Sequence, residues 1–534
     1  MRREANTERA APSPDGGRGA GRPPAWPIGP MAWGLLALLV GLKLLLHLLT
    51  SGAYGYFRDE LYFLDCARHL GWGYVDDAPM IALVGRVGLL LGGSLPAIRL
   101  LPALAGAAKV ALTMAIAREM GGGRFAQGLA GLCVLAAPIY LAIDGLMTPN
   151  AFEPLFWMGC VLVLSRIVRT GDSRLWLWFG VLAGLGLENK YTMLAFGFAA
   201  AVALLLAPQR RELARPWLWL GGLLALALFL PTLLWQASHG FPLVVDMENI
   251  RRIGKNVVLA PAGFVGAQIA LLGPLAAPVW LGGLWSLMAG RLSRLRVLGW
   301  TFLVFFACMM AVQAKSYYLA PIYPMLFAAG ATALEGRLAG WRWSRGRLWP
   351  KASVAAILAL SAALLLPLLL PLLPPAKLLA YQRWLGRKPP QLEVQHEGPF
   401  EQRIGDQFGW DRLSVQVARI YDSLPPKERA QTAIFANNYG EAGAINLYGP
   451  ALGLPTAICA HQAESLWGPP AVQPTTYICL GCDRKSLEQW FDSVTVAAVH
   501  YDRWGMAEEN RPIYLCRGPR ATLAEAWPAL THWD

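Results

Sequence analysis

The sequence predicts a polytopic α-helical membrane protein of about eleven spans, followed by a water-exposed C-terminal α/β domain. The first observation is composition: 55% of the 534 residues are hydrophobic and only 15% are charged, whereas a soluble domain has about 25% charged residues. The second is distribution, because the long apolar runs lie in residues 1–374 and residues 375–534 have an ordinary soluble composition. The third is that arginines recur in the short loops between the apolar runs.

The formal net charge of +13 belongs to the apolar part of the chain. Residues 375–534 contain 15 Lys and Arg against 17 Asp and Glu, so this part is nearly neutral. A nucleic-acid-binding protein would gather its basic residues on a soluble domain. Because the excess lies in loops between apolar runs instead, it indicates membrane topology and excludes nucleic acid as a partner.

The N-terminal part begins with a segment that we expect to be disordered. Residues 1–30 are rich in Arg, Gly, Pro and Ala, a composition that buries little apolar surface. The next run, 31–50, is long enough to cross a bilayer and has no A-x-A-like cleavage site. We therefore expect a cytoplasmic tail and a retained first helix.

The transmembrane domain is expected over residues 31–374, with residues 51–96 as its first external loop. The run 80–95 carries Arg86 in its middle and has an amphipathic pattern, so we place it on the membrane surface. The spans are predicted at 31–50, 97–117, 125–143, 151–169, 175–188, 191–207, 216–235, 263–289, 297–313, 317–334 and 351–374.

The distribution of arginine predicts which side each loop faces. With the N-terminus inside, every basic cluster faces the cytoplasm, as the positive-inside rule requires. The same arrangement places the C-terminal domain outside. The clusters are Arg118 and Arg124; Arg166, Arg169 and Arg174; Arg210, Arg211 and Arg215; Arg291, Arg294 and Arg296; and Arg337, Arg342, Arg345, Arg347 and Lys351.

The external ends of the spans carry acids and isolated lysines. Ionisable groups this close to hydrocarbon are costly and are usually functional. Acids together with lone lysines at one membrane face indicate chemistry on an amphiphile with an anionic head. These residues are Asp59, Glu60, Asp65, Asp76, Asp77, Asp144, Glu188, Lys190, Asp246, Glu248 and Lys315.

The C-terminal domain, residues 375–534, alternates short β-like runs with helical ones, which predicts an α/β module. Strands are expected at 432–435, 456–459, 476–480, 494–500 and 512–516, and helices at 412–423 and 485–491. Four cysteines in an oxidising compartment favour disulfides, with three possible pairings. The C-x-x-C spacing of Cys479 and Cys482 is also that of a redox or zinc half-site, but a second ligand pair at the usual spacing is missing. The four cysteines are Cys459, Cys479, Cys482 and Cys516.

The strongest local signal is the segment 56–62, Tyr-Phe-Arg-Asp-Glu-Leu-Tyr, directly after the first span. Helical spacing puts Asp59, Tyr62, Cys66 and His69 near one face. An acidic pair beside a membrane surface suits a general base. The alternative is a helix N-terminus, where Asp and Glu are favoured in the first turn.

Several short motifs follow one another along the first part of the chain: Asp59-Glu60, Trp72-Gly73-Tyr74-Val75-Asp76, Ala78-Pro79, Asn189-Lys190-Tyr191-Thr192 and the run from Lys315 to Pro324. Through these motifs, most of residues 45–335 resembles the glycosyltransferase family 39-like membrane enzymes of the GT-C superfamily. These include protein O-mannosyltransferases and the lipid A aminoarabinose transferases. The C-terminal Leu466-Trp467-Gly468-Pro469 is similar to bacterial members with a periplasmic tail.

The resemblance implies a GT-C-like fold and an inverting transfer of a sugar from a polyprenyl-phosphate carrier to an acceptor hydroxyl. It implies that Asp59 is the general base and that Glu60 positions the acceptor or supports Asp59. Lys190 and Lys315 are the candidates for binding the donor phosphate; snorkelling to the interface is their alternative role. The acceptor would be a glycolipid, a polysaccharide or a protein, at the outer face of a bacterial inner membrane.

Further side chains are candidates for contacting the substrate. Many family members have an aspartate near the position of Asn150, and this departure leaves the second acid unassigned. A divalent metal therefore stays possible, and no cofactor is required. The aromatic candidates have interface anchoring as their alternative role. The candidates are Tyr62, Asp76, Asp144, Asn150, Glu153, Tyr191, Tyr317 and Tyr318.

Two other functions compete with the enzyme. A transporter or flippase of lipid-linked sugars would bind its substrate near the bilayer midplane, often between repeats. The sequence has no convincing repeat, and its charges gather at one face instead. The protein could also be a scaffold or receptor with an external binding domain. The acid-rich first loop would then have no role.

Overall fold

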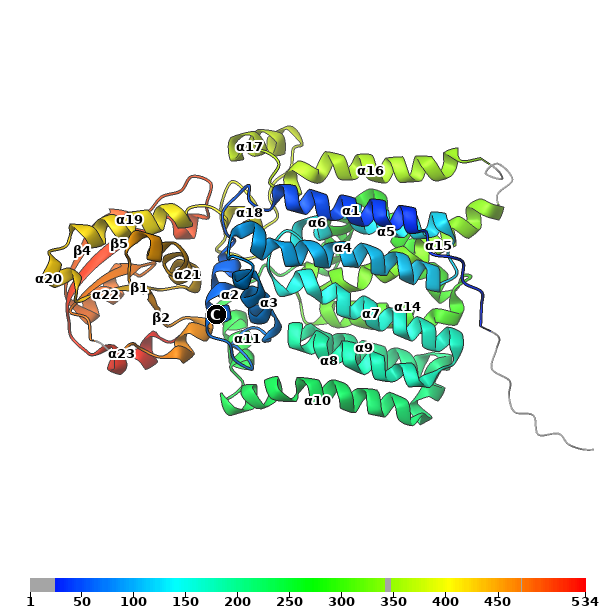
Figure 1. The fold of residues 1–534 in the computed structure, drawn as a ribbon, viewed down its shortest axis with the longest axis horizontal. Coiled ribbons are helices and arrows are strands. Elements are labelled where there is room, and N and C mark those ends of the chain that lie inside the picture. The colour runs from blue at the N-terminus through cyan, green and yellow to red at the C-terminus, as the bar shows by residue number, and fades with distance from the viewer. Residues whose placement is uncertain (1–24, 341–346, 472) are drawn as a thin grey trace, which may run out of the picture.

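A computed structural model describes residues 25–340, 347–471 and 473–534 of the chain. Long helices form one bundle, and a small sheet domain lies against one end of it (Figure 1). The chain enters the bundle at the opposite end. Most of the predicted disordered tail, residues 1–24, and Arg342 and Arg345 lie outside the described residues.

The bundle is built from helices that lie at each of the predicted spans. Most of these helices are 13 to 25 residues long and rich in apolar side chains, and the helical backbone satisfies its own hydrogen bonds, as a bilayer requires. The helices are α1 (Trp33–Thr50), α4 (Leu95–Glu119), α5 (Arg124–Ala136), α6 (Pro138–Ile143), α7 (Pro149–Thr170), α8 (Trp176–Asn189), α9 (Thr192–Leu206), α10 (Pro216–Ser238), α12 (Pro261–Leu272), α13 (Ala277–Met288), α14 (Arg296–Ala311), α15 (Tyr323–Gly340) and α16 (Trp349–Leu369).

The expected count of about eleven full spans is not confirmed, because several helices are short or broken. Within the described residues, six helices are long and apolar enough to cross a membrane, or up to eight if each bent pair is one span. Pro138 separates α5 from α6, and α12 and α13 meet at 93° around Gly273 and Pro274. A proline lacks the N–H that a continuous helix needs, and Gly273 has a φ of 87°.

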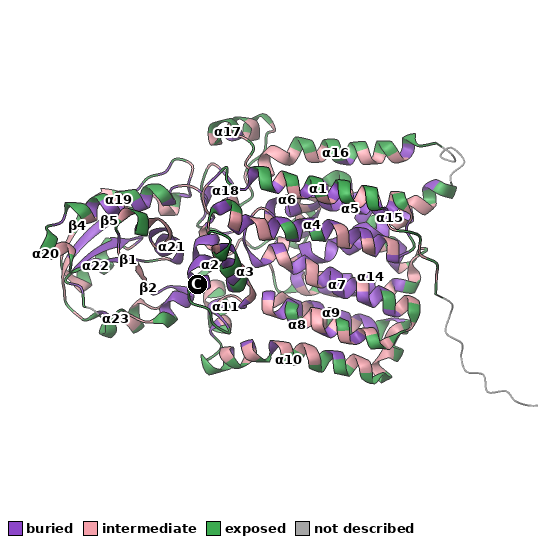
Figure 2. Cartoon of the chain, in the orientation of Figure 1, coloured by how far each residue is buried: buried purple, intermediate pink, exposed green. Residues whose placement is uncertain are grey.

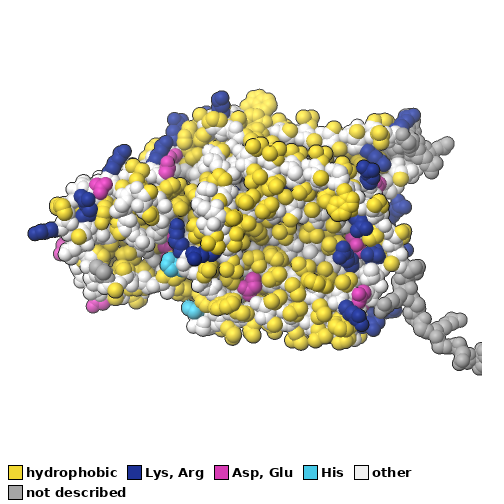
Figure 3. Space-filling view, in the orientation of Figure 1, with side chains coloured by type: hydrophobic (Ala, Val, Ile, Leu, Met, Phe, Trp, Pro, Cys, Tyr) yellow, Lys and Arg dark blue, Asp and Glu magenta, His cyan; other side chains and the backbone are white. Residues whose placement is uncertain are grey.

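The outer surface of the bundle is largely hydrophobic in the view of Figure 3, as a lipid-facing surface must be, and Figure 2 shows exposed stretches along α10 and α16. Only 6% of the apolar window of α16 and 17% of that of α10 are buried inside the protein. Trp219 and Leu223 on α10 and Leu360 on α16 are each more than half exposed. An apolar surface of this extent needs a bilayer around it, so the chain is a multi-pass membrane protein.

Basic side chains gather at the end of the bundle that is remote from the sheet domain (Figure 3). There Glu119 is buried and bound by Arg169 at 2.6 Å and Arg166 at 3.5 Å. This is the arrangement that the loop arginines predict, with the basic loops and the C-terminal domain at opposite ends.

Short elements lie between the bundle and the sheet domain: α2 (Arg58–Arg68), α3 (Met80–Leu90), α11 (Pro242–Ile253), α17 (Pro375–Trp384) and α18 (Gln402–Gly405). The run that we placed on the membrane surface forms α3, which packs on α2 and α4. Gly85 faces Ala67 of α2, and Gly88 faces Ile98 of α4. Both glycines allow close approach of the neighbouring helix.

The C-terminal domain is a five-stranded mixed sheet with the order β2-β1-β3-β5-β4. β1 is parallel to β2 and β3, whereas β5 is antiparallel to β3 and β4. Each predicted strand lies in this sheet. The strands are β1 (Thr432–Ala436), β2 (Ile458–Cys459), β3 (Thr476–Leu480), β4 (Phe491–Val499) and β5 (Pro512–Pro519); the helices are α19 (Trp410–Ser423), α20 (Pro426–Arg429), α21 (Tyr439–Tyr448), α22 (Arg484–Trp490) and α23 (Leu523–Leu530).

The cysteines of this domain are free thiols in the structure, so the disulfides that the sequence suggests are not formed in it. Cys479 on β3 pairs with Tyr514, and Cys516 on β5 pairs with Tyr477. The two cysteines are therefore diagonal neighbours on the sheet, and the thiol of Cys479 lies within hydrogen-bonding reach of those of Cys516 and Cys482.

The packing of α13 on α15 gives a direct test of the bundle. A Cβ on Gly283 would collide with the backbone carbonyl of Leu326, whereas a Cβ on the neighbouring Gly282 meets nothing within 4 Å. We expect Gly283→Ala to lower the stability by roughly 1–3 kcal/mol, seen as a lower melting temperature of the purified protein in detergent. Gly282→Ala is the matched control and should leave it unchanged or slightly higher, because alanine favours helix. Equal melting temperatures for the two variants would contradict this packing.

Candidate functional site

A cavity of about 480 Å³ lies where the bundle meets the C-terminal domain. One wall is apolar and comes from bundle helices and α17. The side chains of this wall include Ile139 and Ile143 of α6, Leu271 of α12, Leu365, Leu368 and Leu369 of α16 and Leu378 of α17. Because α16 is exposed along most of its length, this wall continues into the lipid-facing surface.

The other end of the cavity is polar and has an excess of basic side chains. Six basic residues face three acidic ones, so this end attracts an anion. An apolar wall that ends in a basic patch fits an amphiphile with a negatively charged head. The basic residues are Arg58, Lys255, Lys315, Arg387, Lys388 and Arg403; the acidic ones are Asp59, Glu393 and Glu401.

Asp59 reaches this end because the first turn of α2 is held by its neighbour Glu60. Glu60 is fully buried and accepts hydrogen bonds from Arg99 Nε at 3.0 Å and Nη2 at 2.8 Å. It also accepts from the backbone N–H of Phe57 and of Met147, each at 2.9 Å. The capping role that the sequence left open is thus taken by Glu60, and its neighbour Asp59 lies on the cavity wall.

Arg99 itself is anchored on several sides. Its guanidinium donates to the backbone oxygens of Ser51 and Gly55, at 3.0 and 2.9 Å, and to the side chain of Gln407 at 3.2 Å. One guanidinium therefore connects four parts of the chain. These are α4, the end of α1, helix α2 and the segment after α18 that leads into the sheet.

The partner of Asp59 comes from the C-terminal domain. Tyr439, the first residue of α21, donates its hydroxyl to Asp59 Oδ1 at 3.0 Å. Burial raises the pKa of Asp59 above its usual value, while Arg58 and the Tyr439 hydroxyl act against that rise. A carboxyl with a raised pKa beside a cavity is a candidate general base.

Close packing brings Tyr439 to this position. A Cβ on Gly440 would meet the side chain of Arg58 at 2.5 Å, and one on Gly443 would meet Leu61 at 2.8 Å. These two glycines, one helical turn apart, let α21 lie directly on α2. Asn446 adds a hydrogen bond to Asp65 Oδ2 at 2.7 Å.

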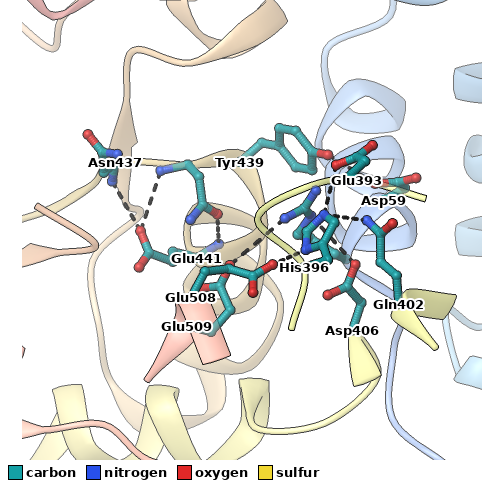
Figure 4. Close-up of polar contacts among 12 residues, drawn as sticks. Asp59, Glu393, His396, Gln402, Asp406, Asn437, Tyr439, Glu441, Glu508 and Glu509 are labelled. Carbon is teal, nitrogen blue, oxygen red and sulfur yellow. Dashed lines mark hydrogen bonds and ion pairs between the residues drawn. The ribbon is translucent and has the colours of Figure 1, made fainter. Parts of the chain in front are cut away.

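Behind Asp59, further charged side chains form a network that spans both domains (Figure 4). Arg58 lies 3.9 Å from Asp406 and 4.0 Å from Glu509. His396 is hydrogen-bonded to Glu393 and Glu508, and these contacts raise its pKa to about 9 despite its burial. Figure 4 shows these residues converging from α2, from the segment 393–406 and from the sheet domain.

Of the two predicted phosphate-binding lysines, the structure places one on the cavity wall. Lys315 lines the cavity and pairs with Glu393 at 2.6 Å. Lys190 lies behind the wall, where it donates to Asn150 Oδ1 at 2.5 Å and lies 4.5 Å from the ring centre of Tyr318. Asn150 and Tyr317 do line the cavity, and Lys190 contacts it through Asn150 and through the ring of Tyr317, whose centre is 5.8 Å away.

The other predicted substrate-binding residues lie off the cavity. Tyr62 donates to Asp76 at 2.7 Å, and burial raises the pKa of Asp76 to about 7. Tyr191 donates to the backbone oxygen of Asp77 at 3.3 Å. These contacts hold the first loop against the start of α9.

Asp144 and Glu153 are also engaged within the protein. Asp144 is fully buried between Lys109 at 2.5 Å and Lys43 at 2.9 Å. Glu153 accepts from Thr192 and lies 3.8 Å from Lys190. Both acids hold bundle helices together in the structure.

Sequence reasoning missed Tyr439 and three of the six basic residues. Arg387, Lys388 and Arg403 come from segments that the motifs did not cover, whereas Lys255, in the external loop 236–262, was a weaker candidate for the phosphate. The signal for Tyr439 was local: Asn438 and Glu441 form a capping box that starts α21 at Tyr439. Nothing in the sequence showed that this helix start would meet Asp59.

The question of a metal was left open by the sequence. Among the described residues, two groups place three possible ligand atoms within 4.8 Å of one another, and neither contains Asp59. One is His461, His532 and Asp534; the other is His396, Asp406 and Glu508.

Together, the fold and the site define a multi-pass helical membrane protein whose lipid-accessible cavity ends at a carboxylate and a basic patch under an α/β domain. The family model described as dolichyl-phosphate-mannose-protein mannosyltransferase matches residues 76–235. A search of curated proteins by sequence finds no match.

Two crystal structures of ArnT from Cupriavidus metallidurans have a similar fold. The one bound to undecaprenyl phosphate aligns with a TM-score of 0.59 and 15% identity, over 92% of this chain and 100% of that chain. The apo structure aligns with a TM-score of 0.58 and 16% identity, over 94% and 100%. The chain thus has the fold of ArnT, and the resemblance to GT-C membrane glycosyltransferases drawn from its motifs is confirmed.

The anchoring of α2 gives a second test. Arg99→Gln leaves the carboxylate of Glu60 buried without its cation, which costs about 3–5 kcal/mol. We expect a clear fall in the melting temperature of the variant in detergent. Arg86 on the neighbouring helix α3 is exposed, so Arg86→Gln is the matched control and should melt like the unchanged protein. An Arg99→Gln variant as stable as this control would refute the anchoring role.

Proposed function

We propose that the protein is a membrane glycosyltransferase that moves a sugar from a polyprenyl-phosphate carrier to an acceptor hydroxyl, with inversion and with Asp59 as the general base. The observation that carries the proposal is the cavity, which joins a lipid-facing apolar wall to Asp59 and six basic side chains. The polyprenyl chain lies along the leucines of α16, and the phosphate lies at the basic end.

The proposed reaction needs one general base, Asp59, and the basic side chains of the cavity. The acceptor oxygen attacks the anomeric carbon from the face opposite the phosphate, and its proton goes to Asp59. The bond between the anomeric carbon and the phosphate oxygen breaks, and the electron pair leaves with the polyprenyl phosphate. The transition state has oxocarbenium character. Phosphate is a good leaving group, so the cations that stabilise its charge take the place of a general acid.

In this proposal the basic residues have different roles because they lie at different places around the cavity. Lys315 is part-buried, and its ion pair with Glu393 holds its ammonium group at the basic end of the cavity, where the phosphate would bind. Arg387 and Lys388 are exposed on the cavity rim and meet the headgroup as it enters from the membrane. Lys190 acts as a positioning residue, because it holds Asn150 on the wall.

Tyr439 orients the base. Its hydroxyl fixes one carboxylate oxygen of Asp59, which leaves the other for the acceptor proton. Glu60 supports Asp59 through the helix start and does not reach the substrate.

The comparisons support this assignment through the fold and through the ligand of a similar structure, the ArnT crystal structure bound to undecaprenyl phosphate. We place the protein in a bacterial inner membrane with residues 375–534 in the periplasm, since the basic loops lie at the opposite end of the bundle. The acceptor is a glycolipid, a polysaccharide or a protein that reaches the site from that side.

Replacing the base tests the reaction. We expect Asp59→Asn to lower transfer from a labelled lipid-linked sugar by roughly 10²–10⁴-fold, as loss of a general base does. The variant should still bind undecaprenyl phosphate, because the basic patch is intact. Asp422→Asn, at an exposed position of α19, is the control and should keep full activity. Undiminished transfer by a folded Asp59→Asn variant would remove the assignment, and movement of the carrier without transfer would favour a flippase.

The pH dependence tests the role of Tyr439. The carboxylate form of Asp59 is the active base, so activity is lost as pH falls through the raised pKa of Asp59. The Tyr439 hydroxyl stabilises that carboxylate, and Tyr439→Phe should therefore raise the pKa of Asp59 further and move the acidic limb of the pH–rate profile to higher pH. The exposed Tyr501 gives the control, Tyr501→Phe. An acidic limb that stays in place or moves to lower pH would contradict the hydrogen bond.

A further inference from the structure

The cluster of His396, Asp406 and Glu508 lies beside the cavity, in the network of Figure 4. The cavity chemistry gives it no role. One possible ligand atom from each of the three side chains lies within 4.8 Å of the other two. His396 comes from the segment after α17, Asp406 follows α18, and Glu508 lies in the turn Ala507–Glu509 of the C-terminal domain.

Asp406 is the first sign that the cluster is incomplete. Its side chain is 1% exposed, and neither of its carboxylate oxygens has a hydrogen-bond partner within the described residues. Its nearest cation, Arg58, lies 3.9 Å away. Glu508 Oε2 is buried without a partner in the same way. Buried carboxylate oxygens are almost always satisfied, so two such groups aimed into one cluster indicate a place that suits a cation.

The surroundings of the cluster contain charges of both signs. Four carboxylates converge here, those of Glu393, Asp406, Glu508 and Glu509, and the side chains of Arg58, Lys315, Lys255 and Arg511 lie near them. A divalent cation bound here would take the place of the proton on His396.

The imidazole of His396 is oriented as a metal ligand would be. Nδ1 faces Glu508, and Nε2 lies 2.8 Å from Glu393 Oε2 and 2.6 Å from the side-chain nitrogen of Gln402. A metal-bound histidine usually donates its other ring N–H to a carboxylate, which fixes the tautomer. Glu393 provides this carboxylate, and a metal would take the place of the proton that Nδ1 shares with Glu508.

We propose that His396, Asp406 and Glu508 bind a divalent transition-metal ion, with zinc as the best fit. One imidazole nitrogen and two carboxylate oxygens form a ligand set that zinc accepts, with water completing the tetrahedron. This inference does not depend on the reaction at Asp59.

The ion would act as a clamp between the two domains. Its ligands come from the segment 396–406 and from the sheet domain, which also meet through the hydrogen bond from Ala507 N to Glu397 O at 2.8 Å. Through His396 and Glu393 the clamp extends to Lys315 on the cavity wall. The metal therefore sets the position of a cavity lysine without entering the cavity.

Zinc binding by the purified full-length protein in detergent tests the proposal. After chelation and removal of the chelator, the protein is titrated with zinc chloride, and bound zinc is measured by elemental analysis. The unchanged protein should take up zinc at this site, and Asp406→Asn and His396→Gln should lose it. Glu393→Gln removes only the carboxylate behind His396, so its zinc affinity should fall by roughly 10–100-fold.

The second group of possible ligands gives the matched control. His532→Gln alters the group of His461, His532 and Asp534 and should keep the zinc that Asp406→Asn loses. Equal zinc uptake by Asp406→Asn and the unchanged protein would overturn the proposal, as would loss of zinc in His532→Gln alone.

A melting experiment separates metal binding from a simple folding defect. Zinc should raise the melting temperature of the stripped unchanged protein and of His532→Gln, but not that of Asp406→Asn, which has nearly the same shape as the original side chain. If zinc leaves every melting temperature unchanged while His396→Gln lowers it, a protonated His396 joins the carboxylates without a metal, and the proposal fails.

Discussion

The buried ion pair of Glu60 and Arg99 is the interaction on which the rest of the site depends. Both side chains are almost fully buried, and between them they also bind the backbone of Ser51, Gly55, Phe57 and Met147. A pair with so many additional hydrogen bonds overcomes the cost of burying its charges. It fixes the first turn of α2 against α4 and the α6–α7 turn, and it thereby fixes the place of Asp59 at the edge of the bundle.

The C-terminal domain is part of the site and not an appendage to it. Gly440 and Gly443 let α21 lie on α2 at a distance that a side chain would prevent, and Tyr439 then meets Asp59. The segment that leads into the domain adds Glu393, which pairs with Lys315. Tyr439 therefore helps to set the position of Asp59 from 380 positions away in the chain. Glu393 does the same for Lys315 from 78 positions away.

The charged side chains in and beside the bundle fall into two sets. Lys43, Lys109 and Asp144 satisfy one another inside the bundle, where solvent is absent. The basic residues of the cavity are part-buried or exposed and lie at the edge of an apolar wall. Only this second set is available to an anionic head whose tail remains in lipid. This difference explains why a charge near the membrane is not by itself a sign of substrate binding.

The sequence by itself determined the helical membrane bundle, the separation of its basic loops from the C-terminal domain, the α/β character of that domain and the place of Asp59 in the first loop, because apolar length, arginine position and strand periodicity are local properties. The sequence also indicated both Lys190 and Lys315 as candidates for binding the donor phosphate. Only the tertiary structure put Lys315 on the cavity wall and Lys190 behind Asn150, and brought Tyr439 to Asp59. These outcomes depend on the packing of segments distant in the chain, and no single stretch of sequence contains both partners of such a contact.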